Sequence, residues 1–139
     1  MSQENVDVAL RLYDALNGGV AVDEMTDELL AVAFDPAIEL QQLSSLAGTT
    51  GRFHGYEGLR DAQRELEEAL TDNRWEPLEH VANGDRVGFA VKASGRGRAS
   101  GVRVERPVGH LFELRGGRIS RWIVYPAPEQ ALEAAGLSE

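Results

Sequence analysis

Histidine is the side chain of this sequence best suited to proton transfer, and the chain has His54, His80 and His110. Cysteine is absent, which excludes disulfides, thiolate nucleophiles and thiolate-bound metals. An imidazole ordinarily titrates near neutral pH, so His110 could donate a proton to a bound carbonyl or enol, or accept one from it. A buried histidine can also be satisfied by a neighbouring polar group without doing any chemistry. Both interpretations of His110 stay open.

The spacing of the histidines does not predict a metal site, because no two of them share one face of a helix or strand. His54 precedes Gly55 in a predicted loop, where it could line a pocket mouth or lie on the surface. His80 lies on a predicted strand at 74–82 whose two faces the sequence does not distinguish. We expect no metal and no other cofactor.

The strand that carries His110 is predicted from its alternating pattern. His110, Phe112 and Leu114 fall on one face, which we expect to point inward. Gly116-Gly117 supplies the positive φ angles of a tight hairpin turn, and residues 119–125 resume the alternation. A hairpin therefore places the strand of His110 directly beside the predicted last strand.

Helical and strand patterns elsewhere predict an α+β fold. Apolar residues at three- and four-residue spacing predict helices, and alternating runs between glycine or proline turns predict strands. Helices are expected at 6–16, 25–33, 59–70 and 129–135, and strands at 37–43, 74–82, 85–94, 102–114 and 119–125. Residues 49–55 are expected to form a loop. The strands from Arg74 to Tyr125 should form one curved antiparallel sheet, with the first three helices on its concave side.

Composition predicts one compact domain over residues 1–139, with 42% apolar residues. The net charge of −9 disfavours nucleic acid and anionic membranes as partners. Arg96 and Arg98 form the only local basic cluster, and they are interpreted as an exposed loop tip. No apolar run reaches membrane-spanning length and the first residues lack a signal-peptide pattern, so we expect a cytoplasmic protein.

Five stretches, taken in order, carry a family resemblance: Leu12-Tyr-Asp-Ala-Leu-Asn-Gly18, Gly55-Tyr-Glu-Gly-Leu-Arg60, Gly84-Asp-Arg-Val87, Arg115-Gly-Gly-Arg-Ile119 and Glu129-Gln-Ala-Leu-Glu-Ala-Ala-Gly-Leu137. Together they resemble the nuclear transport factor two-like superfamily, in its SnoaL-like group of polyketide cyclase and ketosteroid isomerase-like proteins. The resemblance covers nearly the whole chain. It implies a cystatin-like cone whose curved sheet encloses an apolar pocket, often in a homodimer. It does not imply one reaction, since its members include isomerases, epoxide hydrolases, cyclases and proteins that only bind.

The resemblance also places the family's catalytic positions on this chain. His110 takes the position of the acidic hydrogen-bond donor of the ketosteroid isomerases. Their oxyanion tyrosine falls on Leu12 and their general base falls at or next to Leu40. Val124 takes the position of an acid in the epoxide hydrolases and cyclases. Leucine and valine can neither accept nor donate a proton. The resemblance therefore implies that this chain retains neither the isomerase mechanism nor the acid-dependent mechanism of the hydrolases and cyclases.

The predicted pocket has His110 as its polar centre and is otherwise mainly apolar. Its expected ligand-binding residues are Leu12, Leu40, His54, Tyr56, Phe89, Phe112, Trp122 and Val124. Tyr13 is interpreted as a core residue, because its neighbour Leu12 takes the family's functional position.

Two functions follow as alternatives. The pocket would bind a small hydrophobic carbonyl compound and act on it as an isomerase, cyclase or lyase with His110 as acid or base. Alternatively, the chain is a non-catalytic ligand-binding or dimerisation module. Arg121, Ile123 and Tyr125 alternate with the inward residues of the last strand, which predicts a homodimer through the outer face of the sheet.

Overall fold

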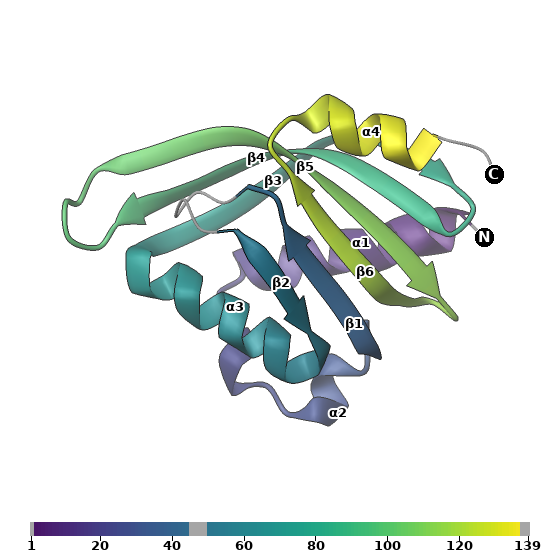
Figure 1. Ribbon diagram of the computed structural model, residues 1–139, viewed down its shortest axis with the longest axis horizontal. Helices are drawn as coiled ribbons and strands as arrows, with labels where there is room; N and C mark the ends of the chain where they lie inside the picture. Colours follow the sequence, from purple (N-terminus) through teal and green to yellow (C-terminus); the bar gives the residue numbers. More distant parts are fainter. Residues whose placement is uncertain (1, 45–49, 137–139) are drawn as a thin grey trace.

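The chain forms one curved sheet with helices on both of its faces (Figure 1). The computed structural model describes residues 2–44 and 50–136. The elements are α1 Ser2–Asn17, the 3₁₀ helix η1 Val22–Glu24, α2 Asp27–Leu30, β1 Phe34–Gln42, β2 Gly51–His54, α3 Gly55–Ala69, β3 Leu70–Asn83, β4 Arg86–Gly97, β5 Arg103–Arg115, β6 Arg118–Tyr125 and α4 Pro128–Gly136. The predicted α+β class is confirmed, and no helix of the described part is long and apolar enough to span a membrane.

The described sheet has six strands in the order β2-β1-β6-β5-β4-β3 and does not close on itself. The four strands β3 to β6 form the expected antiparallel meander. The strand β1 joins the far side of β6 in parallel, with Leu40 opposite Trp122. This places the first strand of the chain directly beside the last one.

The expected loop at 49–55 and the expected second helix differ in the structure. Residues 51–54, predicted as part of a loop, form β2, because the backbone of Gly51–His54 pairs with Glu39–Gln42 of β1. Thr49, at the start of that predicted loop, lies outside the described residues. The predicted second helix is shortened to Asp27–Leu30, where the Thr26 hydroxyl caps the helix by accepting from the Leu29 amide at 3.3 Å.

The strand β1 starts earlier than the strand predicted at 37–43. The strand begins at Phe34, and Pro36 falls where the pairing with β6 is irregular, between Phe34 and Glu39. A proline is tolerated there because its missing amide hydrogen is not needed by the ladder.

The strand β3 changes face along its length. Its register with β4 shifts between Pro77 and Glu79. Before this irregularity Trp75 packs into the concave core, and beyond it Ala82 does so while Val81 packs on the outer face. A simple alternation over 74–82 therefore could not assign one inward face to the whole strand.

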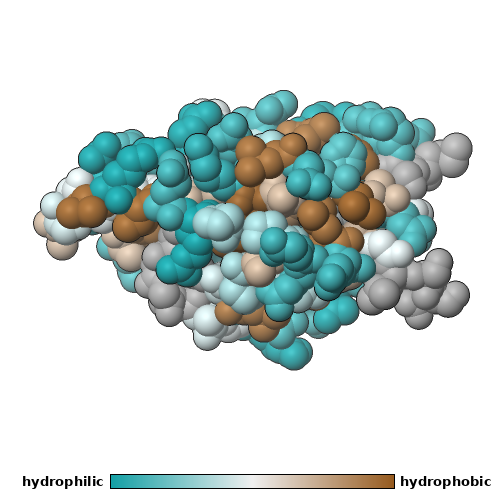
Figure 2. All heavy atoms as spheres, turned by 90° about the horizontal axis from the view of Figure 1, so that it is seen from above, coloured by the Kyte–Doolittle hydropathy of each residue, from teal (hydrophilic) through white to brown (hydrophobic). Residues whose placement is uncertain are grey.

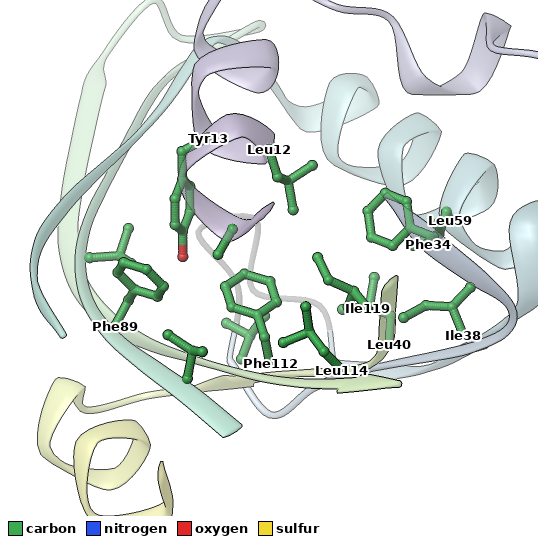
Figure 3. Packing of buried hydrophobic residues seen from close by; sticks show 14 of the residues in the cluster. Leu12, Tyr13, Phe34, Ile38, Leu40, Leu59, Phe89, Phe112, Leu114 and Ile119 are labelled. Carbon is green, nitrogen blue, oxygen red and sulfur yellow. The ribbon is translucent and has the colours of Figure 1, made fainter. Parts of the chain in front are cut away.

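The concave side holds the main core, with α1 and α3 packed over the sheet (Figure 3). Tyr13 descends from α1 toward Phe89 and Phe112 on the strands, and Phe34, Leu40 and Ile119 fill the other end. The apolar residues that pack these helices onto the sheet therefore also form the walls of any cavity between them.

The opposite face of the sheet is covered in part by α4, which the sequence did not place. Ala131 and Ala135 are fully buried against the sheet. The helix approaches closely because Gly88 and Gly109 have no side chain: a Cβ on Gly109 would lie 2.7 Å from Ala131 Cβ. Figure 2 looks onto this side and shows apolar residues interspersed among polar ones.

Candidate functional site

A cavity of about 100 Å³ lies between α1, α3 and the concave face of the sheet. Its lining is mainly apolar and includes Leu12, Leu16, Val22, Phe34, Leu40, Leu59, Ala62, Leu66, Trp75, Ala93, Val108, Trp122 and Val124. The polar side chains among its lining residues are Gln42, Ser44, Gln63 and His110. The space is large enough for several water molecules or a small organic ring.

His110 is held in this wall by a hydrogen bond from the first helix. It is 2% exposed, and its Nδ1 lies 2.8 Å from the Tyr13 hydroxyl, which is itself 1% exposed. The two rings stack with centroids 5.8 Å apart and planes 14° from parallel. The phenol therefore fixes the orientation of the imidazole.

Burial keeps both partners of this hydrogen bond uncharged. It lowers the pKa of His110 to about 3 and raises the pKa of Tyr13 well above its usual value. We infer that Tyr13 donates to Nδ1 of the neutral imidazole, because the reverse direction would leave the buried Tyr13 hydroxyl hydrogen without an acceptor among the described residues. The proton of His110 then resides on Nε2, the ring nitrogen that remains for a ligand.

A second N–H group of the same wall belongs to Trp122. Its ring lies 5.4 Å from the His110 ring in an edge-to-face arrangement, and it stacks on Phe34. Its Nε1 is buried and has no hydrogen-bond partner among the described residues. An unpaired buried donor costs about 1–3 kcal/mol, which an acceptor atom on a ligand would relieve.

The structure brings together five of the nine predicted site residues. His110 lines the cavity with Leu12, Leu40, Trp122 and Val124, and these side chains come from α1, β1, β5 and β6. The alignment of Leu40 with Trp122 and of His110 with Val124 across neighbouring strands explains this convergence.

The other four predicted residues lie outside the cavity lining. His54 is exposed, with Nδ1 3.8 Å from the Glu39 carboxylate. The Tyr56 hydroxyl donates to the Phe34 carbonyl at 2.8 Å, which occupies it in the structure. Phe89 and Phe112 pack edge-on against the Tyr13 ring, with centroids 5.3 and 5.9 Å away.

The predicted set lacked several residues that line or support the cavity. Gln42 and Ser44 continue the alternation that starts at Leu40, so the period-two pattern could have found them. Gln63 lies at helical spacing from Leu59 in the same way. Tyr13 carried no comparable signal, because its partner is 97 residues away in the chain.

The described residues contain no group of three or more histidine, aspartate and glutamate side chains close enough to hold a metal ion. The cavity wall combines an apolar surface with two neighbouring residues that carry ring nitrogens, His110 and Trp122. A neutral imidazole donor of this kind polarises a carbonyl group and stabilises negative charge on its oxygen.

Comparison with solved structures gives the same fold. TerC, co-crystallised with polyporic acid, aligns with a TM-score of 0.75 over 94% of this chain and 98% of its own, at 18% identity. A candidate SnoaL-like polyketide cyclase from Jannaschia sp. CCS1 aligns with a TM-score of 0.72 over 99% and 95%, also at 18% identity. Structures with NTF2-like and ketosteroid isomerase-like folds align as well. These likenesses establish the fold.

Sequence comparison gives the family. The phenazine biosynthesis protein PhzA2 of Pseudomonas aeruginosa is 34% identical over 93 residues, which are 62% of this chain and 56% of that protein. The match thus spans little more than half the length of this curated relative. The family model of the SnoaL-like domain matches residues 9–122, the greater part of the chain. The chain belongs to the SnoaL-like domain family.

Proposed function

We propose that the cavity binds a small, mainly apolar carbonyl compound and holds the carbonyl oxygen through the Nε2–H of His110. The observation that carries this proposal is the 2.8 Å hydrogen bond between Tyr13 and His110 in an otherwise apolar wall. With Tyr13 as the donor to Nδ1, the remaining N–H of the His110 ring is on Nε2, available to a ligand in the apolar space. Trp122 supplies a second donor next to it.

The chemistry that suits this donor is the stabilisation of an enol or enolate, as an isomerase or a cyclase requires. Because burial lowers the pKa of His110 to about 3, its imidazole acts as a neutral donor near pH 7 rather than as a general base. The names of the relatives support a small-molecule function: phenazine biosynthesis, polyketide cyclisation and a complex with polyporic acid.

The second candidate is binding without catalysis. It is favoured by the absence of a carboxylate among the described residues that line the cavity, so the wall supplies a donor without an anionic base. Proton transfer in the first candidate then uses water or the substrate itself.

Binding is tested with two probes of nearly the same shape, acetophenone and cumene, of which only acetophenone has a carbonyl. His110→Leu should weaken acetophenone binding by about 1–3 kcal/mol while cumene binding is kept. The carbonyl stretch of bound acetophenone should move to lower frequency in wild type only. His54→Leu is the matched control, because His54 lies outside the cavity. An equal effect of His110→Leu on the binding of the two probes would remove the donor role of His110.

Catalysis is tested separately with the same ketone. Polarisation of the carbonyl should accelerate exchange of the acetophenone methyl hydrogens in heavy water, followed by proton NMR, and His110→Leu should abolish the acceleration. If wild-type protein binds the ketone but leaves exchange at the buffer rate, the non-catalytic function is the correct one.

We also infer a homodimer through the outer face of the sheet. Arg121 is exposed there and Tyr125 is half-buried, whereas Ile123 on the same side is already buried in the cluster with Ala135 of α4. The helix α4 packs mainly on β4 and β5, which leaves the outer side of β1 and β6 for a partner.

A further inference from the structure

An arginine of β5 lies on the same face of the sheet as the cavity. Arg106 precedes Val108 by two residues and His110 by four, and both of these residues line the cavity. The pairing of β4 with β5 is regular here and puts Arg106 opposite Ala93, another lining residue. Because side chains alternate between the two faces of a strand, Arg106 belongs to the concave face.

The side chain of Arg106 reaches the cavity wall at Ser44. The β4–β5 hairpin extends beyond the end of β6, since the pairing of β5 with β6 stops at Gly109 and Tyr125 (Figure 1). In this region the Arg106 side chain extends toward the end of β1, and its Nη1 lies 3.4 Å from the Ser44 hydroxyl. Ser44 is 8% exposed and lines the cavity, whereas Arg106 is exposed. The guanidinium group is therefore next to the cavity lining and still accessible to a ligand.

No described carboxylate neutralises the charge of Arg106. The acids near this part of β5 lie on the other face of the sheet, where Lys92 is 3.6 Å from Glu76 and 3.7 Å from Glu105. Glu105 directly precedes Arg106 in a regular part of the strand, so the two side chains point to opposite faces. Residues 45–49 contain no aspartate or glutamate in the sequence. Arg106 thus has a full positive charge available in a chain whose net charge is −9.

We infer that the ligand of the cavity carries an anionic group of the carboxylate class, and that Arg106 binds this group while the carbonyl of the ligand lies beside His110. The inference rests on the proposed function, because it takes the carbonyl end from there. A guanidinium group suits a carboxylate, since its planar N–H donors match the two oxygens. The Ser44 hydroxyl accepts from Arg106, so its own hydrogen can be donated to the same carboxylate.

The strand sets the distance between the two ends of such a ligand. Arg106 and His110 are four residues apart on one face, which corresponds to about 13 Å between their Cα atoms in an extended strand. Val108 lies between them and lines the cavity. The ligand should therefore have an apolar middle part, such as a ring with a short alkyl chain, between its carbonyl and its carboxylate.

The test uses a series of 4-acetylphenyl alkanoic acids with zero, two and four methylene groups before the carboxylate, each paired with its neutral primary amide. Dissociation constants are measured by calorimetry at low salt. The acid whose length spans His110 and Arg106 should bind about tenfold more tightly than its amide, and the advantage should shrink to about twofold at 0.5 M salt.

Variants locate the effect on one side chain. Arg106→Gln should remove most of the preference for the acid and leave amide binding unchanged. The matched control is Arg103→Gln, which removes an arginine of the same strand from the opposite face, where it lies 3.6 Å from Glu105. This control should keep the preference. His110→Leu should weaken the acid and the amide alike, because it acts on the carbonyl end.

The outcomes separate the two proposals. If acids and amides bind equally while acetophenone binds as expected, the role of Arg106 is wrong and the function of the cavity stands. If Arg103→Gln lowers acid binding as much as Arg106→Gln does, the preference reflects general charge and the inference also fails. If neither acetophenone nor any member of the series binds, both proposals fail.

Discussion

At the scale of single residues, we infer that the hydroxyl of Tyr13 sets which nitrogen of His110 carries the proton. Tyr13→Phe removes the donor to Nδ1 and leaves a buried nitrogen unpaired, so the free energy of unfolding should fall by about 1–3 kcal/mol. Denaturant unfolding measures this loss, and ¹⁵N NMR of the imidazole should show that the Nε2–H tautomer is no longer dominant. Tyr125→Phe, on the outer side of the sheet, should change stability by less than about 0.5 kcal/mol. An unchanged tautomer in Tyr13→Phe would contradict the proposed orientation.

The burial of His110 also makes stability depend on pH. Its pKa is about 3 in the folded protein and near 6.5 when unfolded, so between these values the unfolded chain binds one more proton. The free energy of unfolding should therefore fall by about 1.4 kcal/mol for each pH unit of acidification in that range. Comparing His110→Leu with wild type isolates this contribution from the carboxylates, and the variant should have the shallower slope. Parallel slopes would show that His110 becomes protonated in the folded state.

The sequence predicted His110 and not its partner, for a physical reason. Strand alternation and the glycine turn place His110 on the inward face, and these are local features. Tyr13 lies on the buried side of a helix, where an aromatic residue is normally explained by packing. Its hydrogen bond joins positions 97 residues apart, and no local pattern encodes that contact.

At the scale of elements, the close packing of α4 on the sheet depends on Gly88 and Gly109. Gly109→Ala would bring a Cβ to 2.7 Å from Ala131 Cβ and 2.8 Å from the Ala127 carbonyl oxygen, so the helix must shift. We expect a loss of about 1–3 kcal/mol in unfolding free energy, with larger amide exchange rates in α4. Gly136→Ala, near the end of the same helix, meets only Val81 at 3.8 Å and should be nearly neutral. Slow exchange in α4 of Gly109→Ala would contradict this account.

Elements with strong periodicity were predicted and those that depend on distant pairing were not. The hairpin of β5 and β6 follows from alternation and Gly116-Gly117, and its turn lies where expected. The short β2 has four residues and exists through its pairing with β1, so its own sequence resembles a loop. The expected length of the second helix was wrong because residues 31–33 form a turn that leads directly into β1.

At the scale of the whole molecule, the inferred homodimer has a direct test. Light scattering at micromolar concentration and moderate ionic strength should give twice the monomer mass of 15.2 kDa. Arg121→Glu should shift the mass toward the monomer if the outer side of β6 is the interface, because a charge is reversed where two copies meet. Arg52→Glu serves as the control on an exposed strand away from β6. A monomeric mass for wild type would remove the inference.

The parallel pairing of β1 with β6 has a consequence for how the chain reaches its folded state. Phe34 pairs with Ile119, so the ladder joins residues that are 85 positions apart. The chain must lose the entropy of closing this long loop before the pairing can stabilise it. During synthesis β1 can pair with β2, but its parallel pairing with the rest of the sheet must wait until β6 has been made. The hairpins of β3 to β6 can form among themselves first. Refolding should therefore show the meander protected from amide exchange before β1, with the wall of the cavity completed last.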